Sequence, residues 1–179
     1  NDARIFVLGG TSMLQIGQIN YALPLLSKAN ELSPQKQSIK IYYGNALANI
    51  GQLDQAIQLF KEAYESAPEF SDLRRTYISG LVMAGKEAEA RKLFPKDQDL
   101  FMNDDIANYY MRSKQYAKAI EIFKYLRDKD KTDINRNVRL AQAYYDSQDR
   151  ESAISTIKSL EESHPELKNQ IKEVIKQFE

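Results

Sequence analysis

The stretch that decides the fold is Gly44–Pro68, GNALANIGQLDQAIQLFKEAYESAP. Its central glycine, Gly51, lies 34 residues after Gly17 and 34 residues before Gly85. The same interval separates Ala22, Ala56 and Ala90. A fixed period of this length predicts a solenoid, in which one helical unit is repeated and each unit stacks on the next. Because such an array presents extended surfaces, the sequence indicates a protein that acts by binding.

The repeated unit is predicted to be a pair of antiparallel helices. Apolar residues recur at intervals of three and four over 39–50 and again over 53–67, which is typical of two amphipathic helices. Only Gly51 and Gln52 separate them, and a break that short turns the second helix back along the first. The small residues Gly44 and Ala56 are expected where the two backbones approach most closely. One pair cannot bury both of its faces, which explains the repetition.

With this spacing and these small and bulky positions, the chain resembles the tetratricopeptide repeat family. The resemblance implies an all-α fold, a right-handed α-α superhelix of antiparallel helix pairs with a C-terminal capping helix. It implies a single solenoid over residues 1–179. The repeats are expected at about 3–36, 37–70, 71–99, 100–133 and 134–165, with the capping helix at about 165–178.

Several positions depart from the family pattern. Lys40 occupies a position that is normally large and apolar, and Lys114 stands where a glycine is expected. Ala90 and Ala119 are 29 residues apart instead of 34, so the third repeat is shortened, either as a functional hinge or as a tolerated deletion. Single helices are predicted over 99–113 and 150–163, and Ser163–Glu166 has the form of a capping box before the last helix.

Composition argues against several classes of partner. The 25 Lys and Arg residues balance 25 Asp and Glu residues, so no general cationic field is available to bind nucleic acid. The chain has no cysteine, which excludes disulfides and thiolate zinc sites and leaves its redox compartment open. No apolar run is long enough for direct membrane insertion. We expect a soluble segment, and the sequence does not indicate on which side of a bacterial membrane it lies.

Residues able to support catalysis are scarce. The one histidine, His164, lies beside a proline at a predicted helix start and has no cysteine or serine elbow to act with. Pairs of acidic residues fall in predicted turns or on outward faces, where carboxylates are normally solvated. We therefore expect no enzyme, no catalytic residues, no metal site and no cofactor.

The family resemblance places a partner-binding groove on the first helix of each repeat. The inner positions that it implies include Arg4, Val7, Thr11, Ser38, Ser79, Val82 and Phe101. Those predicted to contact a peptide or protein segment most directly are Asn45, Asn49, Arg75, Asn108, Met111, Arg112, Gln142 and Tyr145. Side-chain amides can pair with an extended backbone, while the tyrosine and methionine can form apolar pockets. The alternative is that these residues only keep an exposed surface hydrated.

A second resemblance concerns the run Tyr21–Gln37, YALPLLSKANELSPQKQ, together with 49–68 and 84–90. These stretches are similar to repeat tails of bacterial membrane proteins of the O-antigen ligase and polymerase type. Two functions are thus predicted. The first is an interaction scaffold that binds a protein or peptide and is able to self-associate as a homo-oligomer. The alternative is the non-catalytic tail of a membrane glycan ligase or polymerase, serving assembly or partner docking.

Overall fold

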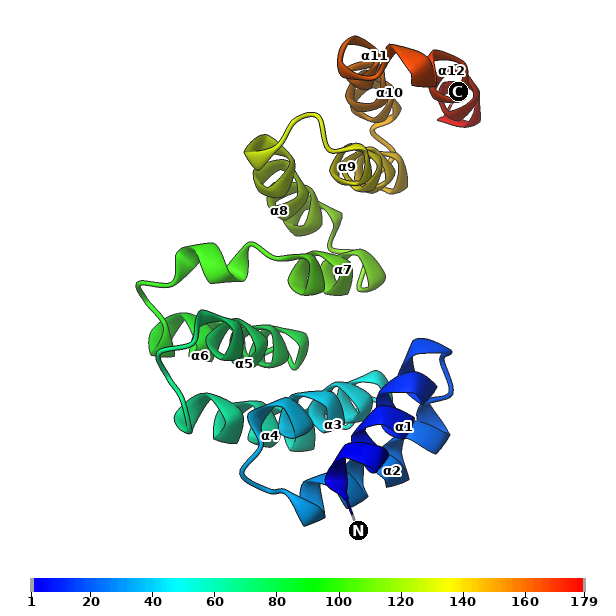
Figure 1. Ribbon diagram of the computed structural model, residues 1–179. Coiled ribbons are helices and arrows are strands. Elements are labelled where there is room, and N and C mark those ends of the chain that lie inside the picture. Colours follow the sequence, from blue (N-terminus) through cyan, green and yellow to red (C-terminus); the bar gives the residue numbers. More distant parts are fainter. Residues whose placement is uncertain (1, 179) are drawn as a thin grey trace. The chain divides into compact units, whose positions relative to one another are not determined.

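The structure is a computed structural model that describes residues 2–178 (Figure 1). All regular elements in this range are helices. No strand occurs within that range. Internal contacts divide the chain into two compact units, residues 1–101 and residues 102–179. The prediction of an all-α array of helix pairs is confirmed, and each unit is described below by itself.

Unit 1 contains three successive helix pairs. Its elements are α1 (Ala3–Gln15), α2 (Ile19–Leu32), α3 (Gln37–Asn49), α4 (Leu53–Glu65), α5 (Ser71–Met83), α6 (Glu87–Leu93) and the 3-10 helix η1 (Gln98–Phe101). Each helix packs against the one before it, and η1 returns to pack on α5.

Unit 2 contains two pairs and a terminal segment. Its elements are α7 (Asp104–Arg112), α8 (Tyr116–Lys129), α9 (Ile134–Asp146), α10 (Arg150–Lys158), α11 (Leu160–Ser163), the 3-10 helix η2 (Pro165–Leu167) and α12 (Lys168–Phe178). The last helix packs on α10 and buries Ile171, Ile175 and Phe178. Its lysines are exposed on the opposite side, so the predicted capping helix is confirmed.

The turn inside each helix pair has one residue with a left-handed backbone. In unit 1 this residue is Gly17, Gly51 or Gly85, with φ between 72° and 82°. In unit 2 Lys114 and Gln148 occupy the matching position with φ of 58° and 71°. Glycine reaches this conformation without a steric penalty, whereas a residue with a Cβ is strained by it.

The core of unit 1 is centred on Phe60, which extends from α4 toward both neighbouring first helices. A Cβ added to Gly44 of α3 would overlap the Cε1 edge of its ring. A Cβ added to Gly80 of α5 would lie 2.7 Å from Cδ2 on the opposite edge. The glycines therefore leave a slot that the ring fills, and Phe60 links three helices.

Lys40, the departure from the apolar pattern, is buried in the structure. Its ammonium donates to Glu62 Oε2 on α4, and Gln58 Nε2 donates to the other carboxylate oxygen at 3.0 Å. These bonds lower the pKa of Glu62, because the Lys40 and Gln58 donors favour the ionised carboxylate. A polar bond between α3 and α4 thus replaces the expected apolar contact.

The structure corrects three local predictions. The helix expected over 99–113 is interrupted at Met102 and Asn103, because the Asn103 side chain caps α7 by accepting from Ile106 N at 3.1 Å. The helix expected over 150–163 is interrupted at Ser159. The predicted capping box does not form either, since the helix continues through Ser163 and its hydroxyl donates back to Leu160 O at 3.3 Å.

Candidate protein-binding surface

A hollow of about 670 Å³ lies in unit 1 between α1, α3 and the loop that joins α2 to α3. Four of the predicted inner positions, Arg4, Val7, Thr11 and Ser38, line it. Its volume is within the range of about 300–1,000 Å³ that is usual for ligand sites. The helix register predicted from the repeat therefore brings these four residues to one concave site.

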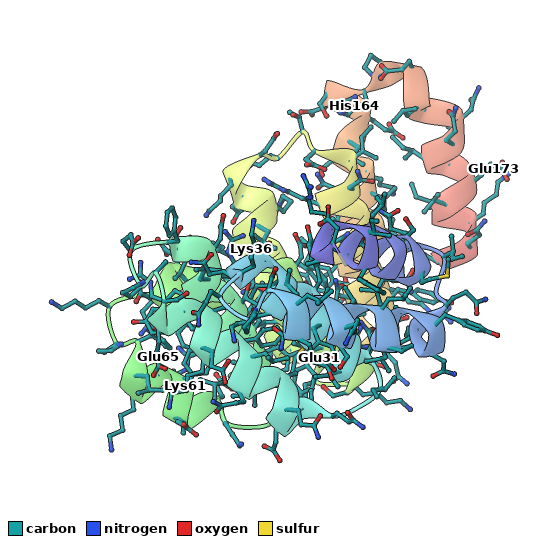
Figure 2. All side chains as sticks on the ribbon, turned by 60° about the horizontal axis from the view of Figure 1, so that its bottom comes forward. Glu31, Lys36, Lys61, Glu65, His164 and Glu173 are labelled. Atoms are coloured by element: carbon teal, nitrogen blue, oxygen red, sulfur yellow. The ribbon has the colours of Figure 1, made fainter. Side chains whose placement is uncertain are left out.

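Polar groups surround this hollow. Asp2 Oδ1 caps α1 by accepting from Arg4 N at 2.9 Å, and the Asp2 carboxylate also pairs with the Arg4 guanidinium at 2.7 Å. These interactions lower the pKa of Asp2 to about 2. Thr11 Oγ1 donates to Val7 O at 2.8 Å within the helix. Lys36, labelled in Figure 2, is exposed just before α3 and adds a second cation to the lining of the hollow.

Apolar residues form much of the rest of the lining, and the repeat pattern did not predict them as lining residues. Leu8 and Tyr42 are both exposed, and Leu32 and Ile39 also border the space. Leu8 and Tyr42 are 34 residues apart and so share one repeat position. The recurrence of a large apolar residue at this repeat position is the sequence signal that could have indicated them. It marks a second row of lining residues beside the row of predicted inner positions.

The other predicted contact residues of unit 1 lie on α3 and α5, outside the lining of this hollow. Asn45 and Asn49 are exposed on α3, where Asn49 Nδ2 donates to Asn45 O at 2.9 Å. Arg75 is exposed on α5 and pairs with Asp72 one turn earlier. The Asn45 side chain and the guanidinium of Arg75 are thus both at the surface of unit 1.

Three other inner positions are corrected by the structure. Ser79 and Val82 are only 2% exposed, and Phe101 is 3% exposed. After Phe94 the chain turns back and η1 packs on α5, which accounts for this burial. Phe101 itself lies under the Arg91 guanidinium, 4.6 Å from the ring centroid. None of the three side chains is available as a surface contact.

In unit 2 the predicted residues lie on α7 and α9. Asn108 and Met111 are half-buried, and Arg112 is exposed in the last turn of α7. Gln142 is exposed on α9 and donates to Asp146 Oδ1 at 2.7 Å. Tyr145 is stacked on Phe178 of the capping helix, with ring centroids 4.9 Å apart. One face of the Tyr145 ring therefore supports the cap.

His164 joins the terminal segment to the loop between α8 and α9 (Figure 2). Its Nε2 lies 2.8 Å from Thr132 O, and its Nδ1 lies 3.2 Å from a Glu166 carboxylate oxygen. The Thr132 carbonyl, followed by the Glu166 carboxylate, raises the pKa of His164 because both groups favour the imidazolium.

Among residues 2–178, no group of acidic and histidine side chains is arranged to hold a metal ion. Within the same range, no helix combines the length and apolarity that crossing a membrane requires.

Comparison with known proteins identifies the repeat. Two family models, both described as tetratricopeptide repeat, match residues 110–175 and 43–70. The chain carries tetratricopeptide repeats. One match lies within each unit, so the family extends to both. No curated protein sequence matches this tetratricopeptide-repeat chain.

Solved structures agree on the fold. A thermophilic TPR protein of Thermus thermophilus is 14% identical, with 98% of each chain covered and a TM-score of 0.62. The Cut9–Hcn1 hetero-tetramer structure of APC/C contains an 18% identical match that covers 99% of this chain and 36% of that one, with a TM-score of 0.60. The MamA protein is 16% identical over 93% of this chain and 94% of its own, with a TM-score of 0.52. At these identities the likeness concerns the fold alone.

Proposed function

We propose that this tetratricopeptide-repeat chain is a protein-interaction scaffold that holds a peptide or protein segment against α1 and α3 of unit 1. The observation that carries the proposal is the hollow between these helices, lined by Val7, Leu8 and Tyr42 and bordered by two cations. A hollow lined by both apolar and polar residues suits a peptide with one large apolar side chain. Asn45, exposed further along α3, would pair with the peptide backbone beyond the hollow.

The proposed binding involves no catalysis, which is in keeping with the general role of tetratricopeptide repeats. Asn45, Asn49 and Arg75 would extend the surface along unit 1. On unit 2, we propose Asn108, Met111, Arg112, Gln142 and the outer part of Tyr145 as a second contact face. The balance of 25 cationic against 25 anionic residues supports protein partners more than nucleic acid, because it provides no general cationic field for phosphates.

The test starts from peptides selected from a displayed random library against the purified chain. A Ser38→Trp substitution places an indole at the border of the hollow, and we expect it to weaken binding at least about tenfold, or 1.4 kcal/mol. Ser71→Trp is the matched control, because Ser71 is also exposed at the start of a first helix but does not line the hollow. Equal binding by both variants, with unchanged circular dichroism, would exclude the hollow as the binding site.

The alternative function, in which this chain is the non-catalytic tail of an O-antigen ligase or polymerase, remains a prediction that rests on sequence resemblance. None of the similar structures described above is of that type. The sequence encoded directly upstream of Asn1 is the test, since a series of apolar spans there would favour this alternative over a scaffold that works alone.

A further inference from the structure

The segment that follows α6 folds back on unit 1. After α6 ends, the 3-10 helix η1 packs on α5. Phe101 at the end of η1 is only 3% exposed, whereas Lys96, Gln98 and Asp99 are exposed to solvent. One buried ring thus anchors residues 95–101, which we call the strap.

The residue of α6 that contacts the strap departs from the repeat pattern. One position after the small alanine of each second helix, the five repeats carry Leu23, Ile57, Arg91, Ile120 and Ile154. Ile57 of α4 is 8% exposed, and its Cγ1 would lie 3.6 Å from a Cβ added to Gly80, so an aliphatic side chain at this position packs on the next repeat's first helix. Arg91 instead places a guanidinium there. The third repeat therefore presents a cation where the other four present an apolar group.

The Arg91 guanidinium contacts the strap at two points. Its Nε and Nη2 donate to Glu87 Oε1 at 3.0 and 2.9 Å, which fixes the group on α6. Its Nη1 donates to Gln98 Oε1 at 2.8 Å, and its Cζ lies 4.6 Å from the centroid of the Phe101 ring. A guanidinium over an aromatic face is attractive because the face of the ring carries partial negative charge. One side chain thus binds both an amide and an aromatic ring of the strap.

A carboxylate is bound at the other end of the strap. Asp97 Oδ1 lies 3.5 Å from Arg74 Nε on α5, and both side chains are partly buried. The Nε atom of Arg74 is itself buried and has no hydrogen bond within residues 2–178, so the nearby carboxylate offsets the cost of burying this cation. Because Asp97 precedes Phe101 by four residues, the strap sequence DQDLF offers an acidic group, an amide and an aromatic ring in that order.

We propose that the surface of α5 and α6 around Arg74 and Arg91 is a peptide-binding site and that the strap is its tethered occupant. Its ligands are segments that carry a carboxylate four residues before a phenylalanine. Arginine and aromatic side chains are enriched at protein interfaces, and both meet here. The tether gives the strap an effective concentration on the order of millimolar, so a partner segment of the same chemistry must compete with it. The hollow is lined by no residue of α5 or α6, so this site goes beyond the proposed function.

A synthetic peptide with the strap sequence, PKDQDLF, blocked at both ends and fluorescently labelled, is the probe. Fluorescence anisotropy measures its binding to the purified chain. We expect the Phe101→Ala chain to bind it at least about tenfold more tightly than wild type does, because the tethered competitor has lost its anchor. Asp97→Asn removes only the ion pair with Arg74 and should tighten binding by about two- to fivefold. Since it leaves the ring in place, it tests the site even where Phe101→Ala does not fold.

Phe70→Ala is the matched control, because Phe70 is 58% exposed in the same unit and lies outside the strap. This variant should bind the peptide no more tightly than wild type. Adding Arg91→Ala to either opened chain should remove the gain, and a peptide with alanine in place of its phenylalanine should bind none of the chains. Circular dichroism checks the fold of each variant.

Equal binding of the peptide by wild type and by the folded opened variants overturns the proposal. A gain that persists after Arg91→Ala, or that the alanine peptide reproduces, overturns it as well. The probe does not come from the displayed library, so this outcome is separate from that of the hollow.

Discussion

The two units build the same turn from different residues. In unit 1 glycine takes the left-handed position inside each helix pair, whereas in unit 2 Lys114 and Gln148 take it with nearly the same φ. In all five turns, the residue after this position donates its backbone N–H to a carbonyl five residues earlier, as Gln52 does to Leu47 and Gln115 to Tyr110. The comparison teaches that packing of the two helices sets this backbone, and that glycine only lowers its strain.

The units also differ where their helices cross. Unit 1 has Gly44 against the Phe60 ring, whereas unit 2 has Ala107 and Ala141 at the equivalent positions, both fully buried. A methyl group is therefore accommodated in unit 2 at a place where α3 of unit 1 has no room for one. Substitutions at these crossings should affect the units unequally.

The largest effect is expected for Phe60→Ala. Removing a fully buried ring that joins α3, α4 and α5 leaves a cavity and should destabilise unit 1 by about 3–5 kcal/mol. Native-state hydrogen exchange should show lost protection over 37–83 and little change over 134–178. Equal losses in both ranges would mean that the two units unfold as one.

A smaller effect is expected for Gly44→Ala. The added methyl group must displace the Phe60 ring, which Gly80 confines on its other edge, so we expect destabilisation of about 1–3 kcal/mol. Urea unfolding gives the free energy. Gly9→Ala in α1, which like α3 is the first helix of a pair, is the control, because the added Cβ would meet only Leu25 Cδ1, at 3.3 Å. Equal effects of the two substitutions would contradict the slot.

The turns should respond in opposite directions. Gly51→Ala forces a Cβ into the left-handed region and should destabilise unit 1 by about 1–2 kcal/mol. Lys114→Gly relieves the same strain in unit 2, partly offset by the greater freedom of glycine in the unfolded chain, for a gain of about 0.5–1 kcal/mol. Thermal midpoints would measure both effects. A lower midpoint for Lys114→Gly would show that the Lys114 side chain stabilises unit 2 by more than the strain of its backbone destabilises it.

The smallest effect concerns pH and only unit 2. Because the folded pKa of His164 is raised, its stabilisation is complete below the unfolded pKa of about 6.5 and is lost as pH rises through the folded value. Protonated His164 can donate to Thr132 O and to Glu166, whereas the neutral ring has only one N–H. The difference in thermal midpoint between wild type and His164→Gln should therefore shrink from about pH 5.5 to about pH 8.5. A constant difference would exclude a role for the proton.

Most of the fold could be predicted because the 34-residue period and the small residues determine how helices pair. The places where polar side chains act on the backbone could not be predicted in this way. Asn103 ends one segment and caps the next, and buried Asn137 donates to Lys131 O and Asp133 O in the loop before it. Neither role has a signature in apolar periodicity. The hollow was only partly predicted, because the exposure of Leu8 and Tyr42 depends on how the helices pack in three dimensions, which apolar periodicity does not show.

The tight packing around Phe60 should also slow the rotation of its ring. A 180° flip of the ring must carry its edges out of the space between Gly44 and Gly80, and no flip is completed unless α3, α4 and α5 separate briefly. Its two ortho protons should then give distinct resonances, whereas loosely packed rings average theirs. The rate at which those signals exchange would report the breathing of three helices through the motion of one side chain.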